Sequence, residues 1–243
     1  MNAPTNQQVF ELDPTLAIGQ IAVALPGSTA VFRELKLDYC CGGQLSLAEA
    51  VAKKGLTLED VLARLANLQR TNDLPVDLPT AELIDHILAR YHEVHRQQLP
   101  ELIAMAKRVE AVHRDDPDVP SGLAALLAKV ADELESHMQK EEQILFPMLK
   151  AGGNPFVVHP IAVMRSEHTD HGENVAALML ITNDMTPPAH ACNTWRALFS
   201  GIQQLCDDLI NHIHLENNVL FPIFEVKPEV KSEEKCEGNC GCH

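Results

Sequence analysis

The stretch His137-Met-Gln-Lys-Glu141-Glu-Gln-Ile-Leu-Phe-Pro147 decides the fold, because it returns as His212-Ile-His-Leu-Glu216-Asn-Asn-Val-Leu-Phe-Pro222. Upstream, Tyr91-His92-Glu-Val-His95 aligns in the same way with Glu167-His168-Thr-Asp-His171. The spacing from His92 to His137 is 45 residues, and that from His168 to His212 is 44. Such an internal repeat indicates a duplicated structural unit. Each half is predicted to be a helical hairpin with a histidine on its first helix and His-x-x-x-Glu on its second.

The region around both copies has a helical pattern almost throughout, with apolar residues three and four positions apart. Breaks fall near residues 115–122, 152–155 and 186–188. Four long helices are therefore expected, at about 80–113, 121–149, 159–184 and 190–225. Two such hairpins make an all-α, up-down four-helix bundle with approximate twofold symmetry.

Residues 1–70 contain shorter helical patterns, interrupted by prolines and glycines. Helices are expected in 46–54 and 57–70, and the polar, proline-containing stretch 71–79 is predicted to be a linker. The sequence thus predicts a small helical domain at 1–70, a bundle domain at 80–225, and a flexible cysteine-rich tail at 226–243.

The composition excludes several classes of function. The formal charge is −15, from 19 basic and 34 acidic residues, which argues against nucleic acid or an anionic membrane as the main partner. No apolar run approaches the roughly 20 residues that cross a bilayer. Residues 1–10 lack the pattern of a secretory signal, so a cytoplasmic location is expected.

The repeated His-x-x-x-Glu pattern predicts a metal site. Residues i and i+4 of a helix are about 40° apart in direction, so His137 and Glu141 share a face, as do His212 and Glu216. Glu142 should point about 140° away from His137, into solvent. Imidazole and carboxylate on adjacent turns are typical of di-iron and di-manganese bundles. Ligands of this kind, without thiolate, suit iron or manganese.

Counting ligands predicts an open site. If each of two metals takes two imidazoles and both glutamates bridge, each metal has four protein ligands, and an oxo or hydroxo bridge makes five. One position per metal would then remain for a small molecule. The expected ligands are His92, His137, Glu141, His168, His212 and Glu216.

Other residues of the repeat are weaker candidates. Glu133, one turn before His137, and Glu167, directly before His168, could hydrogen-bond a ligand or relay protons, although a solvated helix face explains them equally well. His95 and His171 are expected beside the site or at the surface. The Leu-Phe-Pro triplets indicate core packing and a helix terminus. The remaining histidines are expected to be structural or exposed: His86, His113, His159, His190 and His214.

The second chemical signal is Leu37-Asp-Tyr-Cys40-Cys41-Gly42-Gly43. Adjacent cysteines rarely bond to each other, because the small ring strains the peptide. Cys40 and Cys41 could instead react with a partner thiol, bind or transfer iron, or accept a nitrosyl group; alternatively, they are two small buried residues before a turn. The tail residues Cys236, Cys240, Cys242 and His243 could capture a soft metal or lack structure.

Taken together, the cysteine block and the histidine repeat resemble the repair-of-iron-centres family, the iron–sulfur cluster repair di-iron proteins. The matching blocks include Ile84-Asp-His-Ile, Arg90-Tyr-His-Glu, Glu141-Glu-Gln-Ile-Leu-Phe-Pro and Leu215-Glu-Asn-Asn-Val-Leu-Phe-Pro, and extend to Pro222. The resemblance implies a hemerythrin-like bundle, two non-haem iron ions on the six ligands above, and restoration of clusters damaged by nitric oxide or oxidants. The cysteine tail is a departure from the family pattern.

Three functions remain open from the sequence. The first is stress repair, in which the di-iron site donates iron or removes nitric oxide and the cysteines meet the damaged iron–sulfur protein. The second is enzymatic reduction of nitric oxide, for which no electron donor is visible. The third is reversible binding of nitric oxide or oxygen; oxygen carriage is disfavoured, because His168 and His171 are spaced i, i+3 rather than i, i+4. A homodimer is also plausible from the linker-borne cysteine domain.

Overall fold

The computed structural model describes residues 12–68 and 74–225. Most of this part is helical, and its only extended pairing is one isolated bridge between Ala17 and Ser46. The prediction of an all-α protein is confirmed. The N-terminal unit consists of four short helices: α1 Ile18–Ala24, α2 Ser28–Glu34, α3 Leu47–Lys53 and α4 Leu58–Ala66.

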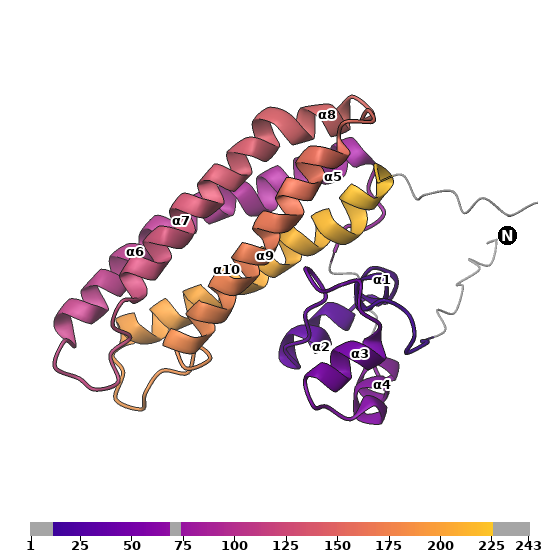
Figure 1. Ribbon diagram of the computed structural model, residues 1–243. Helices are drawn as coiled ribbons and strands as arrows, with labels where there is room; N and C mark the ends of the chain where they lie inside the picture. The colour runs from indigo at the N-terminus through magenta and orange to yellow at the C-terminus, as the bar shows by residue number, and fades with distance from the viewer. Residues whose placement is uncertain (1–11, 69–73, 226–243) are drawn as a thin grey trace, which may run out of the picture.

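The bundle contains four long helical rods, three of them interrupted by a π-helical turn (Figure 1). The first rod joins α5 Thr80–Ile87, η1 Leu88–His92 and α6 Glu93–Val112. The second joins α7 Leu123–Lys140, η2 Glu141–Leu145 and α8 Phe146–Lys150. The third is α9 Val158–Ile181, and the fourth joins α10 Asn193–Leu215, η3 Glu216–Leu220 and the 3₁₀ turn η4 Phe221–Ile223.

These rods agree with the four predicted helices to within a few residues at each end. The first Leu-Phe-Pro triplet does not end its helix: Pro147 lies directly after the π-helical turn η2, and the rod continues through α8 to Lys150. The second triplet does precede the end of its rod. Both triplets pack in the core as predicted, with Leu145, Phe146, Leu220 and Phe221 almost fully buried.

The π-helical turns coincide with the repeated motif. Glu141 is the first residue of η2, and Glu216 is the first residue of η3. His92 is the last residue of η1. Single π-helical turns inside α-helices are found frequently at functional sites. Their recurrence here marks one level of the bundle as special.

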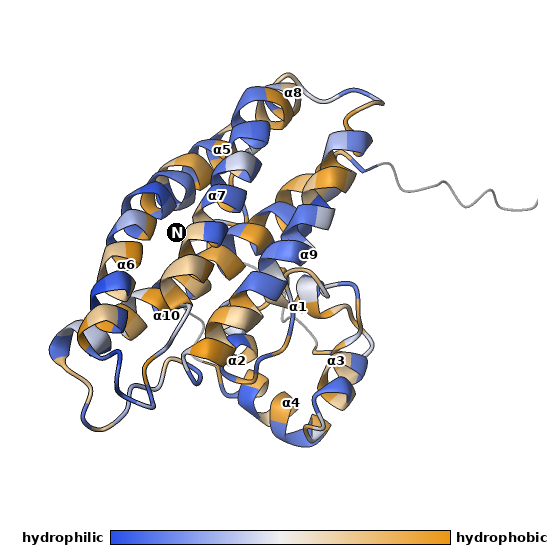
Figure 2. Cartoon of the chain, turned by 60° about the vertical axis from the view of Figure 1, so that its left-hand side comes forward, coloured by the Kyte–Doolittle hydropathy of each residue, from blue (hydrophilic) through white to orange (hydrophobic). Residues whose placement is uncertain are grey.

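This level separates two apolar clusters of the bundle. One cluster gathers residues such as Leu102, Leu127 and Leu205, and the other gathers residues such as Ile84, Phe146 and Phe221. On all four rods the site histidines and glutamates lie where residues of one cluster give way to residues of the other. Hydrophobic and hydrophilic residues alternate along the helices, as amphipathic packing requires (Figure 2). The apolar clusters therefore hold a polar layer in the middle of the core.

The N-terminal unit has its own apolar core and lies beside α10 (Figure 1). Its Cys-Cys-Gly-Gly turn is pressed between α1 and η3: the Gly19 N–H donates to the Gly43 carbonyl at 2.9 Å, and the Asn218 amide donates to the Tyr39 carbonyl at 3.1 Å. A Cβ on Gly43 would lie 2.6 Å from the Tyr39 carbonyl oxygen. The glycine is required because backbone atoms of the N-terminal unit itself and the Asn218 side chain of η3 leave no room for a Cβ.

The cysteine-rich tail, 226–243, lies outside the described residues, as does part of the predicted linker. Among the described helices, none has the length and apolar character needed to span a membrane.

Candidate metal centre

The structure brings the six expected ligands together in two overlapping sets inside the bundle. One set consists of His92, His212 and both glutamates, and the other consists of His137, His168 and the same two glutamates: Glu141 and Glu216. In each set the four ligand atoms lie within 4.8 Å of one another. Each set draws one histidine from each half of the repeat, so the approximate twofold axis exchanges the two sets.

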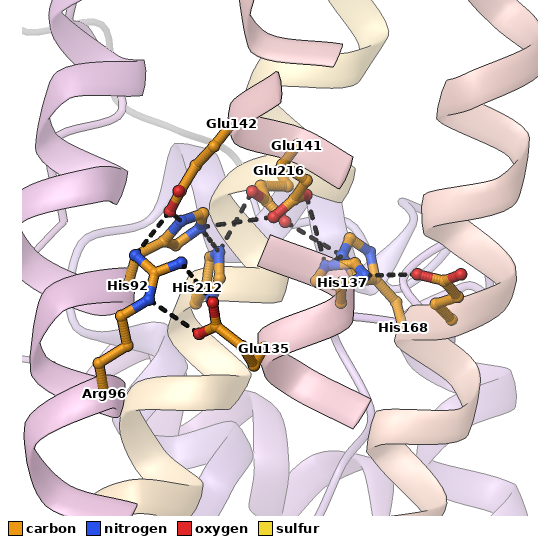
Figure 3. Close-up of polar contacts among 10 residues, drawn as sticks. His92, Arg96, Glu135, His137, Glu141, Glu142, His168, His212 and Glu216 are labelled. Atoms are coloured by element: carbon orange, nitrogen blue, oxygen red, sulfur yellow. Dashed lines mark hydrogen bonds and ion pairs between the residues drawn. The ribbon is translucent and has the colours of Figure 1, made fainter. Parts of the chain in front are cut away.

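Each glutamate is shared between the sets, one oxygen to each side. Glu141 places Oε2 3.4 Å from His92 Nε2 and Oε1 3.4 Å from His137 Nε2. Glu216 places Oε1 3.2 Å from His212 Nε2 and Oε2 3.0 Å from His168 Nε2. Figure 3 shows the two carboxylates between the histidine pairs. This is the geometry expected of two bridging carboxylates.

The burial of these groups tests whether a cation fits. Both glutamates are 0% exposed, and the histidine pairs are nearly as buried. Burial and the adjacent Glu216 carboxylate hold the pKa of Glu141 well above its usual range. Two carboxylates enclosed side by side are costly unless a positive charge is shared between them. The donor set therefore fits metal cations, which would balance this charge.

Three of the four histidines are oriented by a hydrogen bond at Nδ1, which leaves Nε2 facing the glutamates. The partners are Glu142 for His92 at 2.8 Å, Glu167 for His137 at 2.9 Å, and Asn217 for His168 at 2.9 Å. Among the described residues His212 Nδ1 has no partner; instead, Tyr91 stacks on its ring at 5.4 Å. Such outer contacts fix the tautomer of a metal-binding histidine.

The prediction that Glu142 points into solvent was wrong. Its side chain is only 28% exposed, and it accepts hydrogen bonds from His92 and from Arg96, the latter at 2.8 Å. The direction of a side chain on a single helix does not show what a neighbouring helix offers. Glu142 reaches sideways to His92 and Arg96 on the neighbouring rod. The Arg96 guanidinium also binds Glu135, so an ion-pair network covers His92 (Figure 3).

The two glutamate candidates differ in position. Glu167 contacts His137 and also accepts a hydrogen bond from Lys140; although burial opposes it, these bonds give Glu167 a lowered pKa. Glu133 contacts none of the four histidines in the described structure, and instead accepts a hydrogen bond from Asn174 at 2.8 Å. It lines a polar pocket that also includes Glu167 and His171.

His95 and His171 are buried beside the two sets rather than at the surface. The His95 ring lies 5.6 Å from the His212 ring, and the His171 ring lies 4.9 Å from the His137 ring. Neither belongs to a four-atom set, and their ring nitrogens have no hydrogen-bond partner within the described part of the chain. Burial lowers the pKa of His171 to about 3, and that of His95 also falls well below its ordinary value.

Sequence reasoning missed the role of the repeated phenylalanine. Phe221 stacks on His168 with the ring planes 1° apart, and Phe146 stacks on His92. Each copy of the Leu-Phe-Pro triplet therefore covers the histidine on the first helix of its own half. The repeat itself could have signalled this, because both phenylalanines are five residues after a bridging glutamate.

The cysteine pair lies directly against the same layer. Cys41 Sγ donates to the backbone oxygen of His168 at 3.2 Å, and Cys40 packs in the bundle core. Both thiols are free. The Cys41 thiol beside it, together with burial, raises the pKa of Cys40 well above the usual range. Cys41 is less buried and lines a groove of about 740 Å³ between the N-terminal unit and helices α9 and α10.

The fold and site define a metal-binding four-helix bundle of the hemerythrin type. A family described as the hemerythrin HHE cation binding domain matches residues 83–224, and a domain of unknown function (DUF542) matches residues 16–69. Iron–sulfur cluster repair proteins YtfE from Citrobacter koseri, Shigella boydii and Escherichia coli are each 50% identical over 210 residues. The match covers 84% of this chain and 94% of each relative.

The chain belongs to the family of these iron–sulfur cluster repair proteins, with the hemerythrin-like cation-binding domain as its larger part. The resemblance stated from the sequence is thereby confirmed. The family match and the buried histidine–glutamate sets agree that the bundle binds metal cations.

Proposed function

We propose that the bundle holds two non-haem iron ions, one at each histidine pair, with an oxo or hydroxo bridge between them. The main support for this proposal is that each of the two buried carboxylates places one oxygen toward each histidine pair. The proposed ligands are His92, His137, Glu141, His168, His212 and Glu216. Imidazole and carboxylate donors of this number suit iron.

We propose further that this centre serves the repair of iron–sulfur clusters damaged by nitrosative or oxidative stress. Iron bound there would supply a redox-active site with room for a small diatomic ligand and a store of iron for donation. The support is the name carried by the 50% identical relatives, together with the position of the thiol pair. Cys41 in the groove offers a contact point for the damaged iron–sulfur protein.

The experiment for this role is repair of a nitrosylated iron–sulfur enzyme by the iron-loaded protein. Recovery of the enzyme's activity is expected, and the double variant Cys40→Ala/Cys41→Ala should slow it. The control is Cys192→Ala, because Cys192 is exposed and its nearest contact is His113 rather than the site. Full repair by the double variant would remove the thiols from the proposal, and no repair by the wild type would contradict the function.

A second candidate is a protein that binds or reduces nitric oxide without taking part in repair. It is favoured by the fact that His95 and His171 stay outside the two four-atom sets, which leaves the metals fewer protein ligands than six. Anaerobic titration with nitric oxide, with iron release and nitrous oxide followed together, separates the possibilities. Nitrous oxide produced without iron release favours the reductase; iron release without nitrous oxide favours donation.

We also propose that the protein works in the cytoplasm, because the free thiols at the site suit a reducing compartment. A homodimer is also proposed, in which the N-terminal unit of one chain serves the bundle of another; its basis is the linker that the sequence predicts between the two units. Light scattering of the full chain measures this directly, and a mass of one chain would contradict it.

A further inference from the structure

The side chain of Asn217 connects the cysteine pair to a histidine of the site. Its Oδ1 accepts a hydrogen bond from His168 Nδ1 at 2.9 Å, and its Nδ2 donates to the Cys40 carbonyl at 3.1 Å. A third hydrogen bond joins the same two segments, because Cys41 Sγ donates to the His168 backbone oxygen at 3.2 Å. Asn217 is 3% exposed, so both ends of its amide depend on these partners.

The internal repeat shows what is special about this residue. Asn217 follows Glu216 as Glu142 follows Glu141, and both residues accept from a histidine on the first helix of a half. A carboxylate at 217 could hold His168 but could not donate to the Cys40 carbonyl. The Asn217 amide therefore donates a hydrogen bond to the cysteine segment, which its counterpart Glu142 cannot do.

The hydrogen-bonded chain has a physical consequence when a cation occupies His168 Nε2. The cation withdraws electron density from the ring and strengthens the Nδ1–H donor. Hydrogen bonds in series polarise one another, so the bond from Asn217 to the Cys40 carbonyl also strengthens. The segment that carries Cys41 is then held more firmly against α9.

We propose that Asn217 is a positioning residue that couples the Cys40–Cys41 segment to the metal position formed by His137 and His168. A cation at this position protects Cys41 from reagents. By thermodynamic reciprocity, modification of Cys41 weakens the hold on that cation. The other position, at His92 and His212, has no such link within the described residues. The inference rests on the proposed metal site and adds its regulation: thiol chemistry releases one ion first.

The test measures the alkylation rate of Cys41 by iodoacetamide, without oxygen, in the metal-free and the iron(II)-loaded protein. The thiol sulfur displaces iodide and loses its proton, and mass spectrometry of the Cys41 peptide separates it from the other cysteines. In the wild type, loading should slow alkylation about fivefold, the low end of typical coupling between sites. In the reverse direction, the alkylated protein should release one ion faster than the other to an iron(II) chelator.

Three variants separate coupling from general damage. Asn217→Leu removes both hydrogen bonds, so the loaded and metal-free rates should become equal. Asn217→Asp keeps the acceptor for His168 and loses the donor to Cys40, so iron should be retained while protection of Cys41 is lost; this smaller change also serves if the leucine variant fails to fold. Glu142→Gln alters the equivalent support in the other half, and should weaken iron binding while Cys41 protection remains.

The outcomes are distinguishable. If wild-type protein takes up no iron, the proposed function fails and the inference fails with it. If the wild type binds iron normally and either Asn217 variant keeps the wild-type ratio of alkylation rates, the inference alone is overturned.

Discussion

Single side chains make the two metal positions similar but unequal. In the described part of the chain, each position combines one histidine supported by a carboxylate and one without such support. His92 and His137 donate to Glu142 and Glu167, whereas His168 donates to an amide and the His212 ring stacks against Tyr91. A carboxylate partner raises the basicity of a metal-binding imidazole. The outer contacts are therefore expected to adjust how tightly each proposed metal position would hold an ion.

Glu142→Gln tests the importance of this support. Removal of the negative charge behind His92 should lower iron affinity by about 10–100-fold. Competition against a chelator of known affinity measures the change. The matched control is Glu93→Gln, because Glu93 neighbours His92 in sequence but contacts Gln97 instead. Equal affinities for the two variants would show that the negative charge behind His92 has no such effect.

The sequence predicted which six histidine and glutamate residues the structure brings together, but not what holds them. The repeat identified Glu141 and Glu216 because an i, i+4 relation belongs to one helix and can be computed from it. The contacts of Glu142 and Asn217 depend on neighbouring rods and on the docked Cys40–Cys41 segment, so spacing along one helix cannot locate them. Proximity between Cys41 and His168 was equally invisible, because 127 residues separate them.

Among the elements, the Cys-Cys-Gly-Gly turn and helix α9 form one part of the contact between the two units. Gly43 sits where α1, the Tyr39 carbonyl and Asn218 converge, and an added Cβ would overlap backbone atoms. Gly172, on α9, faces the same turn, but an added Cβ there would meet only Cys41 Sγ, at 3.8 Å. Packing therefore requires a glycine at position 43 but leaves room for a Cβ at position 172, although both residues lie at the interface.

A pair of glycine-to-alanine substitutions tests this distinction. Gly43→Ala should destabilise the protein by about 1–3 kcal/mol, because packed backbone cannot yield easily. Gly172→Ala should stabilise it by up to about 1 kcal/mol, since alanine is the better helix former. Urea unfolding of the metal-free proteins measures both. A loss of stability in Gly172→Ala as large as that in Gly43→Ala would contradict the packing described here.

On the scale of the whole molecule, Tyr39 helps to fasten the N-terminal unit to the bundle. Its hydroxyl donates to Asn211 Oδ1 at 3.2 Å, and its ring packs edge-on to buried His214. Arg33 donates to the same Asn211 oxygen at 3.1 Å and lies 3.4 Å from Asp207. Polar contacts thus join two units, each of which has an apolar core of its own.

This attachment predicts a loss of stability in alkaline solution. Burial raises the pKa of Tyr39 above its ordinary value, so the unfolded chain releases the proton first as pH rises. The contribution of Tyr39 is therefore full below about pH 10 and falls above it. Urea unfolding at neutral and alkaline pH should show a smaller decline for Tyr39→Phe than for the wild type. Identical declines would show that Tyr39 ionises freely in the folded protein.

The proposed centre shares two carboxylates between two metal ions inside the bundle. Titration of metal-free protein with iron(II), followed by X-ray absorption to detect iron–iron scattering, tests this arrangement. Saturation at two ions per chain and a short iron–iron distance are expected. Saturation at one ion, or two ions without mutual scattering, would rule out shared carboxylates.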